Sequence, residues 1–146
     1  MDKQEIIKWL IKGDVSIKYQ TYRDLLGNDK KELQDRIANE GWGKKFLLSR
    51  KSNGHWGMRF YQPKWISTHY TLLDLRNMNL NPDNDLVKDT IEMVIDSHIA
   101  NDGGIQLGPS TLEHSDVCVN GMFLNYASYF RTDEQKLCTI LDSILE

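Results

Sequence analysis

The sequence contains few of the features that point to a secreted or membrane-spanning protein. Only two of its 146 residues are cysteines, Cys118 and Cys138, and neither belongs to a CxxC motif. We therefore expect no disulfide framework and a reducing compartment. Polar residues interrupt the longest apolar-rich runs too often for a bilayer span, so we predict none. The N-terminus has no sustained apolar signal core, which favours a cytoplasmic location.

Positive charge is also too scarce for a general nucleic-acid binder. The 18 Lys and Arg residues are outnumbered by 21 Asp and Glu residues, which gives a net charge of −3. The surplus of basic residues that would neutralise phosphates is therefore absent, and we expect no nucleic-acid partner. Apolar residues make up 40% and charged residues 27% of the chain, ordinary values for a globular protein. This length suits one domain with a real core, so we predict a single domain over residues 1–146.

Helical periodicity dominates the sequence. The last residues place an i, i+3, i+4, i+7, i+8 stripe on one helix face: Leu137, Ile140, Leu141, Ile144 and Leu145. No stretch shows the sustained alternation with β-branched residues that marks a strand. We therefore predict an all-α fold. Its seven expected helices lie at about residues 2–12, 15–26, 30–50, 67–79, 84–100, 115–130 and 133–146.

Two long connections that contain glycine, residues 51–67 and 101–115, suggest an internal repeat. At an offset of 49 residues the matched pairs are Gly54 with Gly103, Trp56 with Ile105, and His69 with Cys118. An earlier copy is visible where residues 19–29 are set over residues 69–79. We interpret the chain as about three repeats of roughly 50 residues. Each repeat is a helix pair that must stack on its neighbours to bury its apolar face.

The segment GKKFLLSRKSNGHW, residues 43–56, resembles a known repeat motif. The motif belongs to squalene-hopene cyclases, other terpene cyclases and the β-subunits of protein prenyltransferases. It has a Gly, an aromatic-Leu-Leu helix end, a Gln and an Asp-Gly-x-Trp turn. The matching residues are Gly43, Phe46, Leu47, Leu48, Gly54 and Trp56. Arg50 and Asn53 stand where the motif has Gln and Asp, and the second copy keeps Asp102 and Gly103.

The resemblance implies an α/α toroid whose inner helices are those at 15–26, 67–79 and 115–130. The chain supplies only about three and a half helix pairs, fewer than a closed toroid of this family contains. It is then either a fragment of a longer protein or an open half-toroid. The exposed edge of a half-toroid would favour self-association.

Asp116 and Cys118 match the Asp-x-Cys pair with which the prenyltransferases hold a catalytic zinc at the start of an inner helix. The resemblance thus implies zinc as a possible cofactor, delivering a thiolate for alkyl transfer. The family's histidine ligand lies beyond the end of this chain, so His114 and His69 are candidate substitutes. A structural alternative makes Ser115 or Asp116 a helix N-cap and Cys118 a small core residue. In a toroid, we expect Asp116 to lie close enough to His69 to raise the histidine pKa.

Aromatic residues suggest a ligand-binding concavity. Four lie in the first long connection, Trp56, Phe60, Tyr61 and Trp65, and a fifth, Tyr126, lies on a predicted inner helix. In toroid enzymes such rings line an apolar cavity and stabilise cations, although they could equally pack the loop against helices. The resemblance therefore implies a small apolar, isoprenoid-like ligand near these rings, His69 and Asp116.

The cyclases protonate their substrate with an Asp-x-Asp-Asp run, which this chain does not contain. A locally basic stretch that includes Arg50, Arg59 and Lys64 could attract a diphosphate or could simply be a solvated face. His55 and His98 look like surface or loop residues and receive no role. The alternative function is a helical-repeat module that binds a protein or a second copy of itself, because fold does not entail function.

Overall fold

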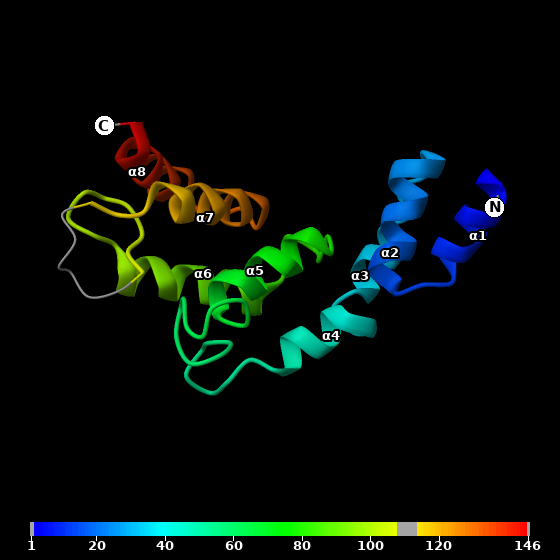
Figure 1. The fold of residues 1–146 in the computed structure, drawn as a ribbon, viewed down its shortest axis with the longest axis horizontal. Coiled ribbons are helices and arrows are strands. Elements are labelled where there is room, and N and C mark those ends of the chain that lie inside the picture. The colour runs from blue at the N-terminus through cyan, green and yellow to red at the C-terminus, as the bar shows by residue number, and fades with distance from the viewer. Residues whose placement is uncertain (1, 108–113, 146) are drawn as a thin grey trace. The chain divides into compact units, whose positions relative to one another are not determined.

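The computed structural model describes residues 2–107 and 114–145, and this part of the chain is helical (Figure 1). The elements in order are α1 (Lys3–Ile11), α2 (Val15–Gln20), the π-helical segment η1 (Thr21–Leu25), α3 (Lys31–Arg36), α4 (Gly41–Leu48), α5 (Thr68–Asn77), α6 (Asp85–His98), α7 (Val117–Tyr129) and α8 (Glu134–Leu145). The β pairing of the described residues is limited to one isolated bridge, between Ile99 and Ile105. The predicted all-α fold is confirmed, whereas the toroid arrangement stays a prediction. Among the described helices none is long and apolar enough to cross a membrane.

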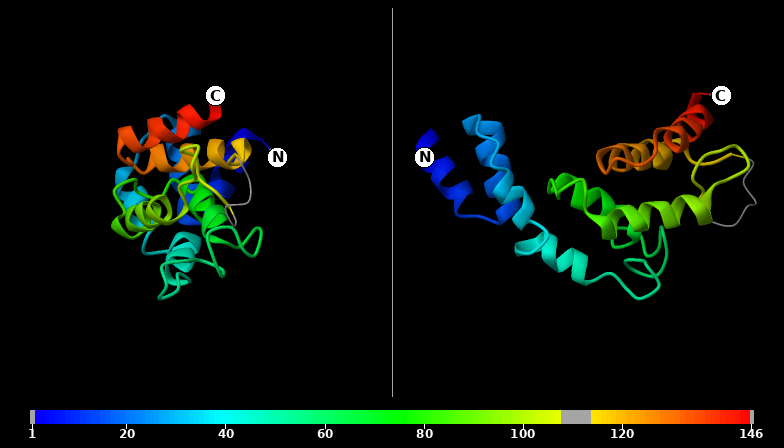
Figure 2. Two further views of the ribbon diagram at one scale, coloured as in Figure 1. Left: turned by 90° about the vertical axis from the view of Figure 1, so that its left-hand side faces the viewer. Right: turned by 180° about the vertical axis from the view of Figure 1, so that it is seen from behind.

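The chain divides into two compact units. Unit 1 comprises Met1–Ser49 and Asn77–Asn81, and unit 2 comprises Arg50–Arg76 and Pro82–Glu146. The apolar core of unit 1 contains Val15, Tyr19, Leu33, Ile37 and Leu80. The core of unit 2 is larger and contains Trp56, Phe60, Leu72, Leu75, Val87, Ile91, Val94, Ile95, Ile105, Val119, Phe123, Tyr126, Ala127, Phe130 and Ile140. Within unit 2, α7 and α8 lie side by side (Figure 1 and Figure 2).

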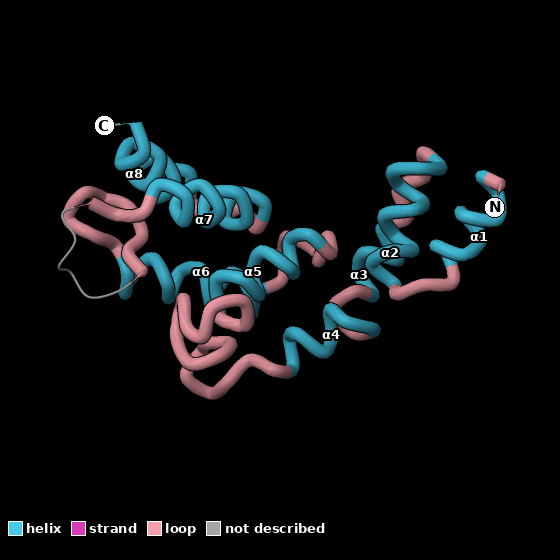
Figure 3. Tube along the Cα trace, viewed as in Figure 1, coloured by secondary structure: helices cyan, strands magenta, loops and turns pink. Residues whose placement is uncertain are grey.

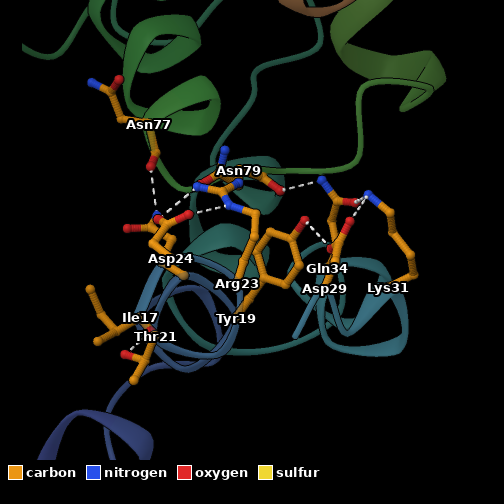
Figure 4. Close-up of polar contacts among 11 residues, drawn as sticks. Ile17, Tyr19, Thr21, Arg23, Asp24, Asp29, Lys31, Gln34, Asn77 and Asn79 are labelled. Atoms are coloured by element: carbon orange, nitrogen blue, oxygen red, sulfur yellow. Dashed lines mark hydrogen bonds and ion pairs between the residues drawn. The ribbon is translucent and has the colours of Figure 1, made fainter. Parts of the chain in front are cut away.

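Side-chain amides attach the segment 77–81 to the helices of unit 1 (Figure 4). The amide nitrogen of Gln20 donates to the carbonyl of Asn77 at 2.8 Å, and that of Gln34 donates to the carbonyl of Asn79 at 3.2 Å. Figure 4 also shows the hydrogen bond from Tyr19 to Asp29 and the two bonds of the Arg23–Asp24 ion pair. The segment is therefore held through two backbone carbonyls, and also through the side-chain amide of Asn81, which donates to the carboxylate of Asp35 at 2.8 Å.

The prediction of one helix over residues 30–50 is wrong, because the chain turns between α3 and α4. Gly41 has a φ of +57°, a left-handed conformation that favours glycine. The carboxylate of Asp14 accepts a hydrogen bond from the backbone N–H of Trp42 at 2.9 Å. A Cβ atom on Gly41 would lie 2.1 Å from that same carboxylate. In a continuous helix the N–H of Trp42 would donate to a carbonyl of the preceding turn. Here the Asp14 carboxylate takes the place of that carbonyl, so α4 begins as a separate helix.

The two glycine turns matched at an offset of 49 have the same backbone structure. Gly54 and Gly103 adopt φ values of +83° and +85°. In each turn the preceding side chain, Asn53 or Asp102, accepts a hydrogen bond from the backbone N–H two residues on, at 3.1 and 3.0 Å. In the first turn the N–H of Lys51 donates to the carbonyl of His55, and the N–H of Gly54 donates to the carbonyl of Lys51. The equivalent bonds of the second turn run from the N–H of Ala100 to the carbonyl of Gly104 and from the N–H of Gly103 to the carbonyl of Ala100. Figure 3 shows both turns within long non-helical connections; the second connection lies partly outside the described residues.

Candidate functional site

An aromatic cluster in unit 2 joins the first long connection to α5 and α7. Its centre is His69, near the start of α5, whose side chain has no exposed surface. The surrounding ring centroids lie at 5.2 Å for Tyr70, 5.4 Å for Tyr61, 5.5 Å for Phe60 and 5.6 Å for Tyr126. The backbone N–H of His69 also donates to the carbonyl of Phe60 at 2.9 Å. Both main chain and rings therefore hold the connection against the helices.

Burial determines the protonation of His69. Its Nδ1 lies 3.2 Å from the hydroxyl of Tyr126, while its Nε2 has no hydrogen-bond partner among the described residues. Because burial penalises the charged imidazole, the pKa of His69 falls to about 4. The expectation that Asp116 raises this pKa is wrong. Asp116 instead accepts a hydrogen bond from the backbone N–H of Val119 at 3.0 Å, as the N-cap of α7.

The structure does not bring the predicted zinc ligands together. His114, Asp116 and Cys118 are exposed, whereas His69 is buried. Across residues 2–107 and 114–145, no three His, Cys, Asp or Glu side chains are grouped so as to hold a metal ion. The alternative placing Cys118 in the core is also wrong. The buried face of α7 is formed by Val119, Asn120, Phe123, Tyr126 and Ala127, so Cys118 lies outside it.

The aromatic residues predicted to face a ligand divide into three groups. Trp56 is 2% exposed and Tyr126 has no exposed surface, so both are core residues. Trp65 is 69% exposed. Phe60 and Tyr61 belong to the buried cluster and also line a hollow in unit 2. Of the predicted residues, these two therefore line the hollow, Tyr61 with partly exposed surface and Phe60 as an almost fully buried ring behind it.

This hollow, here called the His98 pocket, has a volume of about 420 Å³. Its lining residues are Arg59, Phe60, Tyr61, Gln62, Ser97, His98 and Leu107. The ring centroid of Phe60 lies 5.1 Å from that of His98 and 5.5 Å from that of His69. One ring therefore belongs both to the pocket wall and to the buried cluster. Ligand sites commonly combine such preformed apolar walls with a few polar groups.

His98 is the functional candidate that the sequence analysis missed. It lies half-buried in the last turn of α6, with its ring centroid 6.5 Å from that of His55. Burial and the neighbouring His55 lower the pKa of His98, and a hydrogen bond to the carbonyl of Val94 opposes this shift. One signal in the sequence could have identified it: His98 ends a helix directly before the turn at Gly103, which matches the turn at Gly54.

Among the cations of the basic stretch, Arg59 is the one that lines the pocket. Arg50 instead donates to the hydroxyl of Thr90 at 2.9 Å, and the ammonium of Lys64 lies 5.0 Å from the ring centroid of Trp65. Arg59 is exposed, and its side chain forms no ion pair with the residues that the structure describes. The pocket therefore has an available positive charge in its lining.

No model of a protein family, no curated protein and no solved structure matches this chain.

Proposed function

We propose that the protein binds a small, partly apolar ligand in the His98 pocket. The observation that carries the proposal is the combination of the pocket's volume, about 420 Å³, with the nature of its walls. Tyr61 supplies aromatic surface backed by the buried ring of Phe60, while Gln62 and His98 supply hydrogen-bonding atoms. Small-molecule sites typically have volumes of roughly 300–1,000 Å³ and this type of lining.

Contacts outside the pocket fix its aromatic walls. The hydroxyl of Tyr61 forms a hydrogen bond with that of Tyr70 at 2.8 Å. Phe60 is 1% exposed, and its ring packs edge to face against both His69 and Phe123. Because these rings are already ordered, a ligand does not have to immobilise them, which lowers the entropic cost of binding.

The sequence resemblance implies an isoprenoid-like ligand, and the aromatic walls are compatible with an apolar chain or ring. Arg59 would attract a polar or anionic end of the same ligand. The proposal concerns binding alone. It does not extend to cyclisation or prenyl transfer, because the described residues assemble neither the cyclase acid run nor the prenyltransferase ligand set.

The proposal can be tested by filling the pocket. Leu107→Trp places a bulky ring in the lining, and Leu145→Trp makes the same change on α8, where Leu145 is 75% exposed. Isothermal titration calorimetry with the probe 2-naphthol measures the result. We expect the wild type and Leu145→Trp to bind the probe equally, and Leu107→Trp to bind at least about tenfold more weakly. A wild type that does not bind, or a Leu107→Trp variant that binds unchanged, would contradict the proposal.

A second candidate function is self-association through unit 1. Helix α1 contains no fully buried residue, and Ile6 and Trp9 are 39% and 66% exposed. Two hollows of about 350 and 240 Å³ lie along α1 and α2, and both are lined by Leu10 and Ile17. In a stacked helical repeat the next unit covers such a face, so we propose that a second copy of the chain covers this one.

Sedimentation velocity at increasing protein concentration tests this second candidate. We expect the wild type to dimerise and Trp9→Lys to stay monomeric, because the charge would be buried at the interface. Trp42→Lys is the matched control, since Trp42 is 56% exposed in the same unit but lines neither hollow, and it should dimerise as the wild type does. A wild type that is monomeric throughout would exclude self-association.

A further inference from the structure

The hydrogen bonds of Ser97 determine the tautomer of His98. The hydroxyl of Ser97 donates to the carbonyl of Met93, one turn earlier on α6, at 2.6 Å. A serine hydroxyl carries one proton, so the same oxygen can only accept a hydrogen bond from Nδ1 of His98, which lies 2.8 Å away. His98 therefore carries its proton on Nδ1, and its Nε2 keeps a lone pair.

The surroundings of His98 keep the ring neutral. Burial and His55, which approaches from the first long connection, lower its pKa by more than the hydrogen bond to the carbonyl of Val94 raises it, so a second proton is disfavoured at pH 7. Arg59 lines the same pocket and adds a further positive charge there. With Nδ1 committed to Ser97, Nε2 is the ring nitrogen left for a ligand. The polar atom that His98 contributes to the pocket is thus a hydrogen-bond acceptor.

We infer that the His98 pocket selects ligands that carry a hydrogen-bond donor, an alcohol, a phenol or an N–H group, and that Nε2 of His98 accepts this hydrogen bond. The inference rests on the proposed ligand-binding function. The buried ring of Phe60, whose centroid lies 5.1 Å from that of His98, backs the wall beside the acceptor, and the partly exposed Tyr61 offers that wall's aromatic surface to the apolar body of the ligand. A ligand without a donor would displace water from Nε2 without replacing its hydrogen bond, so it would bind more weakly.

The inference can be tested with two probes that share a ring system, 2-naphthol and 2-methoxynaphthalene. Only the first carries a donor. We compare the ratio of the two affinities in each protein, so that the greater hydrophobicity of the methoxy compound cancels between variants. The wild type should favour 2-naphthol by about five- to tenfold relative to His98→Phe, which keeps a ring but has no acceptor. His98→Gln, whose amide oxygen can accept a hydrogen bond, should restore part of the preference.

The tautomer gives an independent readout that does not depend on folding of the His98 variants. Long-range ¹H–¹⁵N NMR of the wild type should show His98 protonated at Nδ1. Ser97→Ala, an exposed change on α6, should give a mixture of tautomers and a smaller preference for 2-naphthol. Equal affinity ratios in the wild type and His98→Phe, or an Nε2–H tautomer in the wild type, would overturn the inference while leaving ligand binding intact. Failure of the wild type to bind either probe would overturn the inference and the proposed function together.

Discussion

Acid should destabilise the protein through His69, and the structure provides the magnitude. The His69 side chain has no exposed surface, and its pKa is about 4 in the folded chain against an ordinary value of 6.5. Between these values the unfolded chain binds a proton that the folded chain does not. The contribution of neutral His69 is therefore fully present above about pH 6.5 and is lost as the pH falls toward 4. At pH 5 the loss relative to pH 7 is about 2 kcal/mol, a factor of about 20 in the folding equilibrium.

Urea unfolding at pH 7 and pH 5 measures this loss. His69→Phe introduces a ring that does not titrate, so the variant should lose about 2 kcal/mol less than the wild type between the two pH values. His55 and His98, whose pKa values burial also lowers, are present in both proteins and cancel in the comparison. Ile66→Phe, at an exposed position without a titratable group, is the matched control and should keep the wild-type pH dependence. An identical pH dependence in the wild type and His69→Phe would refute the reasoning.

Five substitutions at four positions test the local packing. Gly104→Ala would place a Cβ 2.0 Å from the hydroxyl of Ser115 and should lower the free energy of unfolding by about 1–3 kcal/mol. Gly121→Ala, which adds a methyl group in open space on α7, should raise it by about 0.5–1 kcal/mol, and thermal unfolding of both variants measures the contrast. Asp116→Ala should cost about 1 kcal/mol in urea unfolding through the loss of the α7 cap, while Asp116→Asn should be nearly neutral, and equal costs would contradict the capping role. Phe60→Ala should cost about 3–5 kcal/mol and abolish calorimetric 2-naphthol binding, because one ring supports both the core and the pocket; a variant with wild-type affinity would contradict this.

Local chemistry made part of the fold predictable. The matched turns could be found from the sequence because a positive φ favours glycine at Gly54 and Gly103, and because Asn53 and Asp102 accept hydrogen bonds within their own turns. The break between α3 and α4 could not be found in the same way. It depends on Asp14, a residue from another helix start, and such tertiary contacts leave no periodic signal.

The candidate site was predictable in composition but not in geometry. The aromatic content of the first connection located the cluster, yet burial of Trp56 and exposure of Trp65 follow from packing. Cys118 satisfied the spacing of a metal ligand, but the buried face of α7 excludes it. His98 was missed because its acceptor role depends on two tertiary features. The Ser97 hydroxyl donates its proton to the Met93 carbonyl and so accepts from Nδ1 of His98, and the Phe60 ring packs against His98 from a connection distant in sequence.

The most direct test of the central claim is a backbone ¹H–¹⁵N NMR titration of the wild type with 2-naphthol. If the His98 pocket is the ligand site, the amide signals of Tyr61, Ser97 and His98 should shift together along one saturable curve. The signals of Trp9 and Ile17, which line a hollow of unit 1, should stay in place. Shifts at Trp9 and Ile17 with none at Tyr61, Ser97 and His98 would contradict the account.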